Sequence, residues 1–260
     1  MDAEIYLDNN SFIHRLDPRV KIIIFLLTFV AILLFQNPLW MLPITVLIIA
    51  QLIISGALVN LRRIRYILIV LTVSSMILWN LFSTGETQLF WRISVESMSF
   101  AIARTLLMIL MISAGMILIT STRNEELVNG MIRLGMPYRV GFAISTALRL
   151  VPTIVSSTIT ISQAQRSRGL DLESGNLLQR IKKFLPLLVP VFLSTIRNTN
   201  IFGMALESKG FGAKEERTFY LVFEMGRADY LVLVFSIVFM LVSIYFAILG
   251  FGQIEGLIRF

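Results

Sequence analysis

The chain alternates between long apolar stretches and short polar segments. A helix crosses a bilayer with roughly 17 to 25 mostly apolar residues, and five stretches approach or reach this length. None of them shows the apolar and polar alternation of a strand. The pattern therefore predicts an all-α integral membrane protein with about five transmembrane helices, at residues 20–35, 39–54, 66–82, 98–120 and 230–250.

Basic residues predict the orientation of these helices, because Lys and Arg are enriched in the loops that stay in the cytoplasm. They flank the start of the first helix and follow the second, whereas the loop 83–97 contains only Arg92. The N-terminus is therefore expected in the cytoplasm. The residues that decide this are His14, Arg15, Arg19, Lys21, Arg62, Arg63 and Arg65.

A long basic segment separates the fourth and fifth helices. Residues 121–217 hold thirteen of the 23 Lys and Arg residues, so the same rule places this segment in the cytoplasm. Its two moderately apolar runs, 140–164 and 184–196, are interpreted as helices packed under the membrane part or dipping into its surface. The alternative is a topology in which one or both runs cross the bilayer, which would place basic residues outside.

Local signals divide this basic segment into three helices. Residues 122–125 read Thr-Arg-Asn-Glu, a capping-box pattern that predicts a short amphipathic helix ending near Gly135. Two long helices are expected at about 139–168 and 177–209, each ended by a glycine. We therefore expect one domain with three parts: four membrane helices within 1–121, a cytoplasmic helical region at 122–217 and a last membrane helix within 218–260.

Composition narrows the chemistry of the chain. With 56% hydrophobic residues, no cysteine and one histidine, thiolate metal sites and Ser/His nucleophiles are nearly excluded. The net charge of +7 is interpreted as topological, with no nucleic-acid partner. A Gly-x-x-x-x-Gly-Lys-Ser/Thr phosphate loop does not occur, so the chain is not itself an ATPase. Asp171 and Glu173 form a close acid pair between the two long helices, without an Asp-rich cluster to accompany it. A lipid-active enzyme stays an alternative, as does a stand-alone transporter.

The ends of the two long helices repeat each other. Residues 164–170 read Ala-Gln-Arg-Ser-Arg-Gly-Leu and residues 205–211 read Ala-Leu-Glu-Ser-Lys-Gly-Phe, 41 positions later. A glycine after a helix and a basic residue in its last turn are common ending signals, so one copy alone would mean little. Two copies in matching contexts suggest two exposed cationic helix ends that contact two similar partners.

This pair and three further motifs resemble the transmembrane T component of energy-coupling factor (ECF) transporters, the family that also includes the cobalt and nickel importer permease. The other motifs are Ser-Phe-Ile-His-Arg-Leu-Asp-Pro-Arg-Val-Lys at 11–21, Ser-Thr-Arg-Asn-Glu-Glu-Leu at 121–127 and Ala-Leu-Arg-Leu-Val-Pro at 147–152. The resemblance covers about residues 11–250. It implies a non-catalytic energy-coupling subunit of an importer for a vitamin or a metal ion, in the plasma membrane of a prokaryote.

The resemblance also implies partners. In that family an arginine at the end of each coupling helix enters a groove on one of two ATP-binding-cassette ATPases, which bind ATP and Mg²⁺, and a separate membrane S component binds the substrate. Here the resemblance assigns ATPase binding to Ser167, Arg168, Gly169, Ser208, Lys209 and Gly210. Serine replaces the usual alanine twice, and Lys209 keeps the charge of an arginine but lacks its bidentate fork. This chain itself is expected to hold no cofactor and no metal.

Two further groups of residues are expected to serve structure or coupling. The first is His14, Arg15, Asp17, Pro18 and Arg19, in which Asp17 and Pro18 fit an N-cap followed by proline at the first helical position. The second is Arg149 with Pro152. An arginine at membrane depth needs a partner, which the sequence does not name. Within the family, a dedicated cobalt or nickel permease is the nearest alternative. The S component sets the substrate, so this chain does not specify it.

Overall fold

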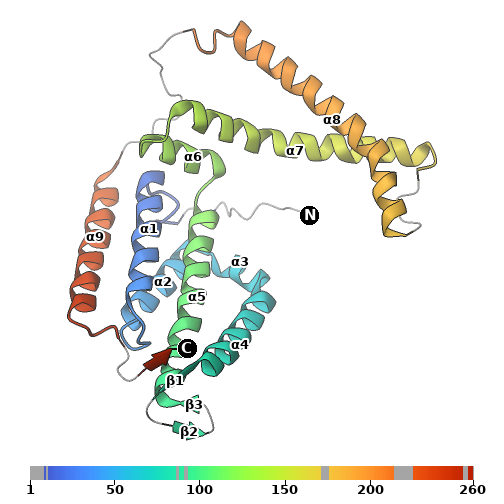
Figure 1. Ribbon diagram of the computed structural model, residues 1–260. Coiled ribbons are helices and arrows are strands. Elements are labelled where there is room, and N and C mark those ends of the chain that lie inside the picture. The colour runs from blue at the N-terminus through green and yellow to red at the C-terminus, as the bar shows by residue number, and fades with distance from the viewer. Residues whose placement is uncertain are drawn as a thin grey trace. The chain divides into compact units, whose positions relative to one another are not determined.

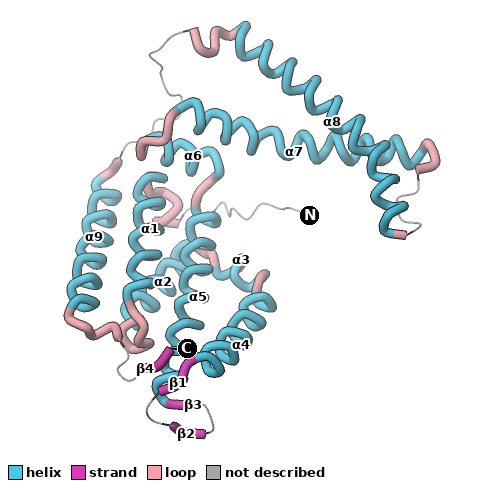
Figure 2. Tube along the Cα trace, viewed as in Figure 1, coloured by secondary structure: helices cyan, strands magenta, loops and turns pink. Residues whose placement is uncertain are grey.

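The computed structural model describes residues 9, 11–85, 88–90, 93–170, 176–213, 225–253 and 257–259. Helices dominate them (Figure 2), with four strands of two or three residues. One compact unit contains α1 to α6, α9 and the strands, and a second contains α7 and α8. In chain order the elements are α1 (Pro18–Leu34), α2 (Leu42–Ser55), α3 (Leu58–Arg63), α4 (Arg65–Phe82), β1 (Ser83–Gly85), β2 (Gln88–Phe90), β3 (Ile93–Ser94), α5 (Val95–Ser121), α6 (Asn124–Arg133), α7 (Tyr138–Ser167), α8 (Leu177–Ser208), α9 (Arg227–Ile248) and β4 (Leu257–Arg259).

Helix α5 is the centre of the first unit (Figure 1). Helices α1, α2, α3 and α4 all pack against it, and α9 packs against α1. The apolar faces of these helices supply a shared core, so the first unit is held together by its own side chains. Its fully or almost fully buried members include Ile32, Met41, Ile44, Ile48, Leu107 and Leu110.

The apolar helices confirm the predicted all-α membrane fold. Four described helices, α4, α5, α7 and α9, are long and apolar enough to cross a bilayer, and α2 is a shorter apolar helix. Helix α1 has 17 residues, at the lower end of the spanning range of about 17 to 25. Because α7 meets the same criterion, the choice between the two topologies rests on the charges around it and not on its own length or hydropathy.

The four strands form two short antiparallel pairs in the first unit. Strand β1 pairs with β4, with Ser83 opposite Arg259, so the end of the chain lies beside the segment that follows α4. Strand β2 pairs with β3. These strands could not be predicted from the sequence, because two or three residues are too few to show a period. They leave the all-α class unchanged.

The junction between α5 and α6 corrects the predicted capping box. The short amphipathic helix is present, but its N-cap is Arg123 and no side chain caps it. Thr122 is extended, with φ −132° and ψ 126°, and is buried at the end of α5. Because α6 begins at Asn124, Thr122 lies one residue too early to act as its N-cap. A capping box does form at the start of α5, between Ser94 and Ser97.

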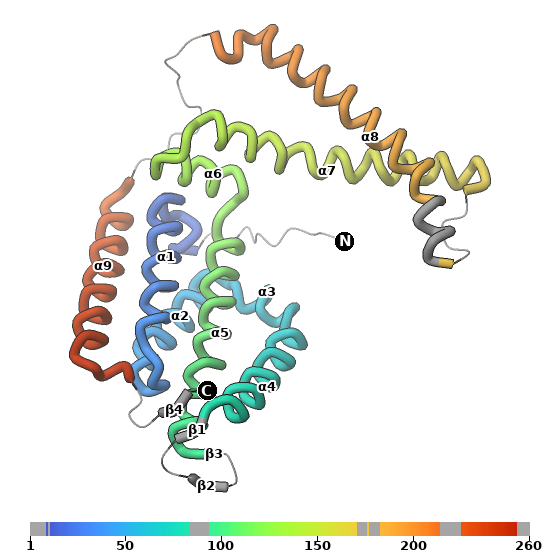
Figure 3. Tube along the Cα trace, viewed as in Figure 1, coloured from blue at the N-terminus to red at the C-terminus, as the bar shows by residue number. Residues whose placement is uncertain are grey.

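The second unit consists of two long helices that cross (Figure 3). Helix α7 has 30 residues and α8 has 32, so each is about 45 to 48 Å long at 1.5 Å per residue. They meet where Ile154 and Thr195 line a small shared cavity. Phe211, just after α8, packs on Phe142 near the start of α7, with ring centroids 4.3 Å apart. Both helices confirm the predicted bounds to within about a residue.

Candidate functional site

The residues assigned to ATPase binding lie at the C-terminal ends of α7 and α8. We call residues 167–169 the first tip and residues 208–210 the second tip. All six residues are exposed. They are therefore placed where a partner protein could reach them without any rearrangement of the helices.

Both tips end their helices with the same hydrogen bonds. At the first tip, the amide of Gly169 donates to the carbonyl of Arg166 at 3.0 Å and the amide of Leu170 to the carbonyl of Gln165 at 3.0 Å. The second tip has the same two bonds, at 2.9 and 3.0 Å, 41 positions later. Gly169 has φ +88° and Gly210 has φ +74°, in the left-handed region that favours glycine. The repeat in sequence is therefore a repeat in backbone structure.

The basic residue is the group that each tip leaves available. The hydroxyl of Ser167 donates to the carbonyl of Gln163 at 3.1 Å, and that of Ser208 to the carbonyl of Ala205 at 2.9 Å. Both serines are thus satisfied within their own helices. Arg168 and Lys209 form no ion pair with another described residue. Each cation lies at the negative end of a helix dipole and can also form an ion pair with a carboxylate of a partner protein.

The two tips lie at opposite ends of the crossed pair. The contact between Phe211 and Phe142 keeps the second tip near the start of α7. Arg168, in the first tip, is 26 residues farther along α7 than Phe142, or roughly 40 Å at 1.5 Å per residue. One small ligand cannot bridge two cations at that distance. The geometry fits two separate protein grooves.

The N-terminal block forms a cap for α1. The side chain of Asp17 accepts a hydrogen bond from the amide of Arg19 at 2.8 Å, and Pro18 occupies the first helical position. These contacts confirm the predicted N-cap. The side chains of Ser11 and His14 are hydrogen-bonded at 2.7 Å. Arg15, in contrast, is exposed, as a residue that serves only orientation would be.

Lys21 joins this block to the end of α5, a link that sequence reasoning missed. Its Nζ donates to the carbonyl of His14 at 2.9 Å and to the carbonyl of Ser121 at 2.8 Å. A carboxylate oxygen of Glu126 lies 4.0 Å from the same Nζ. The side chain is buried, with 4% of the residue exposed. In the sequence, the signal for this link is a lysine at the start of an apolar helix. The carbonyl of Ser121 that accepts its hydrogen bond is 100 residues away in the chain.

Asp229 joins the start of α9 to the start of α1. One carboxylate oxygen accepts from the amide of Asp17 at 2.9 Å and the other from the amide of Gly226 at 2.8 Å. Asp229 is buried. We call Asp17, Lys21, Ser121 and Asp229 the polar junction. It fixes the ends of three membrane helices, α1, α5 and α9, against one another.

Comparisons with known proteins decide the family. The profile of the cobalt transport protein family, CbiQ, matches residues 9–220. The chain belongs to this family. The chain is also similar to proteins named energy-coupling factor transporter transmembrane protein EcfT, among them those of three bacteria. That of Lactococcus lactis subsp. cremoris is 32% identical over 249 residues, 90% of this chain and 93% of the relative. The relative from Clostridium kluyveri is 30% identical, over 92% of this chain and 94% of the relative. The relative from Thermosediminibacter oceani is 31% identical, over 86% of this chain and 89% of the relative.

In this CbiQ/EcfT family member, Arg149 and Pro152 belong to neither tip. Both lie inside α7, and Arg149 is exposed, 19 residues before Arg168. The acid pair Asp171 and Glu173 lies outside the described residues. Within the part of the chain that the structure describes, His, Asp and Glu form no group of three that could hold a metal.

Proposed function

We propose that the chain is the energy-coupling T component of an ECF-type importer, held by one ATP-binding-cassette ATPase at each tip. The observation that carries this is the pair of matching tips, each with one exposed basic residue. Two similar ATPases, each with a similar groove, require two similar contacts from this chain. ATP and Mg²⁺ then belong to the ATPases, and this chain makes and breaks no covalent bond.

Helices α7 and α8 act in this function as two levers. A helix is stiff along its axis because each turn is hydrogen-bonded to the next. When ATP binding draws the ATPases together, the two tips move relative to each other. Because the helices touch where Ile154 and Thr195 lie, a displacement of one tip changes the angle at the crossing. The apolar surface of the pair moves with it.

The exposed apolar side chains of α7 and α8 form the surface for the substrate-binding S component. On α8, Leu188 and Phe192 are 64% and 63% exposed. Contiguous exposed apolar side chains mark interaction surfaces with proteins or membranes. A change of the crossing angle would tilt an S component resting there and release its vitamin or metal ion. The apolar members are Val151, Val155 and Ile159 on α7 and Leu185, Leu188, Val189, Phe192 and Leu193 on α8.

The same function fixes the orientation in the membrane. ATPases that use cellular ATP lie in the cytoplasm, so the tips and the basic segment 121–217 face that side of a prokaryotic plasma membrane. The N-terminus, which carries the basic residues ahead of α1, faces it too. A dedicated cobalt or nickel permease would share this arrangement, because the metal would be bound by the partner subunit.

Charge reversal at the tips tests the proposal. The chain is co-expressed with the ATPases whose genes lie beside its own and is purified in detergent. It is compared as wild type and as the double variant Arg168→Glu with Lys209→Glu. Breaking a buried charge contact costs about 2 to 5 kcal/mol, so the double variant should lose both ATPases and their coupled ATP hydrolysis. The matched control is Arg197→Glu, at an exposed residue in the middle of α8, and it is compared with Lys209→Glu alone, which makes the same change in charge on the same helix.

The control should retain the ATPases. If wild type and double variant carry them equally, the tips are helix caps only, and the stand-alone transporter and enzyme alternatives return. Elution volume and helicity are measured for every variant, so that a loss of folding is not mistaken for a loss of contact.

A further inference from the structure

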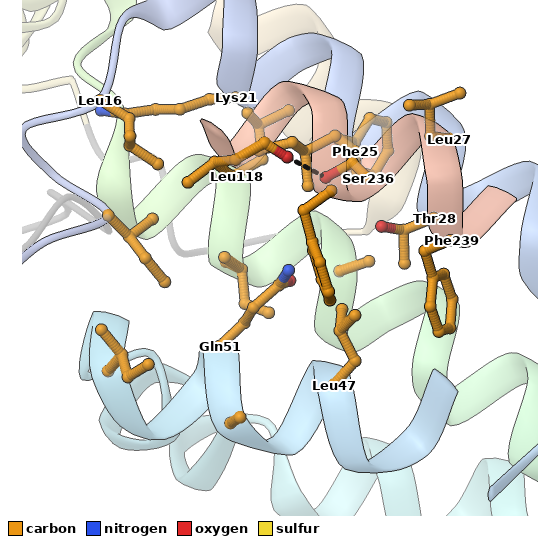
Figure 4. A pocket seen from close by; sticks show the side chains of 18 of the residues that line it. Leu16, Lys21, Phe25, Leu27, Thr28, Leu47, Gln51, Leu118, Ser236 and Phe239 are labelled. Atoms are coloured by element: carbon orange, nitrogen blue, oxygen red, sulfur yellow. Dashed lines mark hydrogen bonds between the residues drawn. The ribbon is translucent and has the colours of Figure 1, made fainter. Parts of the chain in front are cut away.

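Four membrane helices of the first unit, α1, α2, α5 and α9, surround a cavity of about 490 Å³ (Figure 4). Its volume lies within the range of about 300 to 1,000 Å³ typical of ligand pockets. Most of its lining is apolar, with Phe25, Leu47 and Phe239 among the larger side chains. All the lining residues belong to the first unit.

The cavity is open to the outside of the helix bundle. Several lining side chains are themselves exposed, among them Val46 at 65%, Ile54 at 49% and Phe235 at 60%. They belong to α2 and α9, and α9 is long and apolar enough to span a bilayer. Exposed apolar side chains on such helices contact lipid. The opening therefore leads from the hydrocarbon layer into the bundle.

One end of the cavity is polar. Ser121 lines it, is 1% exposed, and its hydroxyl has no hydrogen-bond partner among the described residues. In Figure 4, Leu16 and Lys21 lie at one side of the cavity, and Thr28 and Phe239 lie at the other. Lys21 donates to the carbonyl of Ser121, so its ammonium group lies at the same end of the cavity as Ser121.

We propose that this cavity binds one acyl chain of a bilayer phospholipid, whose ester carbonyl accepts a hydrogen bond from the hydroxyl of Ser121. Ser121 is the last residue of α5, where a spanning helix reaches the ester region of the bilayer. A hydrocarbon chain gains from each methylene that it buries. A peptide segment would have to satisfy its own backbone groups, and the largely apolar lining offers few partners for them.

Photolabelling with a lipid tests the site. The chain with its co-purifying subunits is placed in nanodiscs of phosphatidylethanolamine and phosphatidylglycerol. A small share of the phosphatidylethanolamine carries a diazirine in the middle of one acyl chain. After irradiation, mass spectrometry locates the labelled residues. Labelling should concentrate on lining residues such as Leu47, Leu118 and Phe239.

Two serine variants form a matched pair for this experiment. Ser236 lines the cavity, whereas Ser74 is exposed on α4 and does not. Both hydroxyls donate to a carbonyl of their own helix, at 2.8 and 3.1 Å. Ser236→Trp should lower cavity labelling about tenfold, the loss expected when roughly two methylenes are kept from burial. Ser74→Trp should leave cavity labelling at the wild-type level.

A second pair tests the polar end without adding volume. Ser121→Ala and Thr122→Val each remove a buried hydroxyl that has no described partner, but only Ser121 lines the cavity. Loss of one hydrogen bond should lower cavity labelling about fivefold in Ser121→Ala, with Thr122→Val unchanged. If Ser236→Trp does not fold, this second pair of variants tests lipid binding in the cavity by itself.

Two results would overturn the proposal. The first is labelling spread evenly over the lipid-facing side chains and unaffected by Ser236→Trp and Ser121→Ala. The second is cavity labelling that occurs in the chain alone and disappears in the complex, since the occupant would then be a partner protein.

Discussion

The two units of the molecule differ in how much apolar surface they bury by themselves. Helix α5, with 27 residues, has twelve that are buried. Helix α7, with 30 residues, has one, Gly141. Both helices are apolar enough to span a bilayer, so composition does not explain the difference. The first unit is organised around its own core, whereas the second presents its apolar side chains to whatever surrounds it.

The polar groups show the same contrast. In the first unit they are paired between helices: Asn60 donates to Thr120 at 2.9 Å and Thr105 to Ser75 at 3.0 Å, in addition to the polar junction. In the second unit the side-chain hydroxyls bond mostly to their own helices, and the tips are exposed. This contrast is what the proposed function requires, with the first unit as the fixed part and the second as the part that the ATPases hold and move.

The largest expected effect is at the polar junction. Lys21→Met keeps most of the side-chain volume but removes the ammonium group. The carbonyls of His14 and Ser121 then lose their donor, and the carboxylate of Glu126, 4.0 Å away, loses its counter-charge. Removing one partner from a buried charged group costs about 3 to 5 kcal/mol. We expect this loss in the free energy of unfolding, measured by denaturant titration in detergent.

Arg15→Met is the matched control, because Arg15 is a nearby basic residue that is exposed. Its free energy of unfolding should change by no more than about 0.5 kcal/mol. Equal effects of the two substitutions would mean that Lys21 serves only membrane orientation, and the contrast between the units would lose its main support.

Equivalent leucine truncations compare the two units directly. Leu110 on α5 is 3% exposed and Leu188 on α8 is 64% exposed. Leu110→Ala should lower the free energy of unfolding by about 2 to 5 kcal/mol. Leu188→Ala should change it by no more than about 0.5 kcal/mol in the isolated chain, yet weaken retention of the S component during purification. A stability loss as large for Leu188→Ala would show that the second unit has a core of its own.

Sequence reasoning succeeded where the deciding signals are local. The ends of α7 and α8 follow from glycines and basic residues within one turn, so their bounds and the matching tips could be predicted. The N-cap at Asp17 followed from two adjacent residues. The capping box at residues 122–125 failed by one residue, because α6 begins at Asn124 and its N-cap is Arg123, so Thr122 lies one position too early to cap it.

Sequence reasoning did not reach the polar junction or the cavity. The acceptor of Lys21 is 100 residues away, and Asp229 accepts from a backbone amide 212 residues away. No spacing rule connects such positions. In the sequence, Lys21 and Asp229 look like ordinary charged residues at the ends of apolar helices. Only the packing of α1, α5 and α9 shows that they meet.

The smallest expected effect concerns two helical glycines, one in each unit. A Cβ added to Gly130 on α6 would lie 3.0 Å from the Cβ of Pro18 and 3.2 Å from its carbonyl carbon, whereas one added to Gly203 on α8 would meet no atom within 4 Å. Pro18 cannot move away easily, because it is the first helical residue after the N-cap Asp17.

The same glycine-to-alanine change should therefore have opposite signs. Overpacking costs about 1 to 3 kcal/mol, so Gly130→Ala should destabilise the chain. Gly203→Ala should stabilise it by up to about 1 kcal/mol, the difference in helix propensity. Denaturant titration of both variants measures the signs. If Gly130→Ala is also stabilising, α6 can move away from α1, and the first unit is less rigidly packed than its buried contacts indicate.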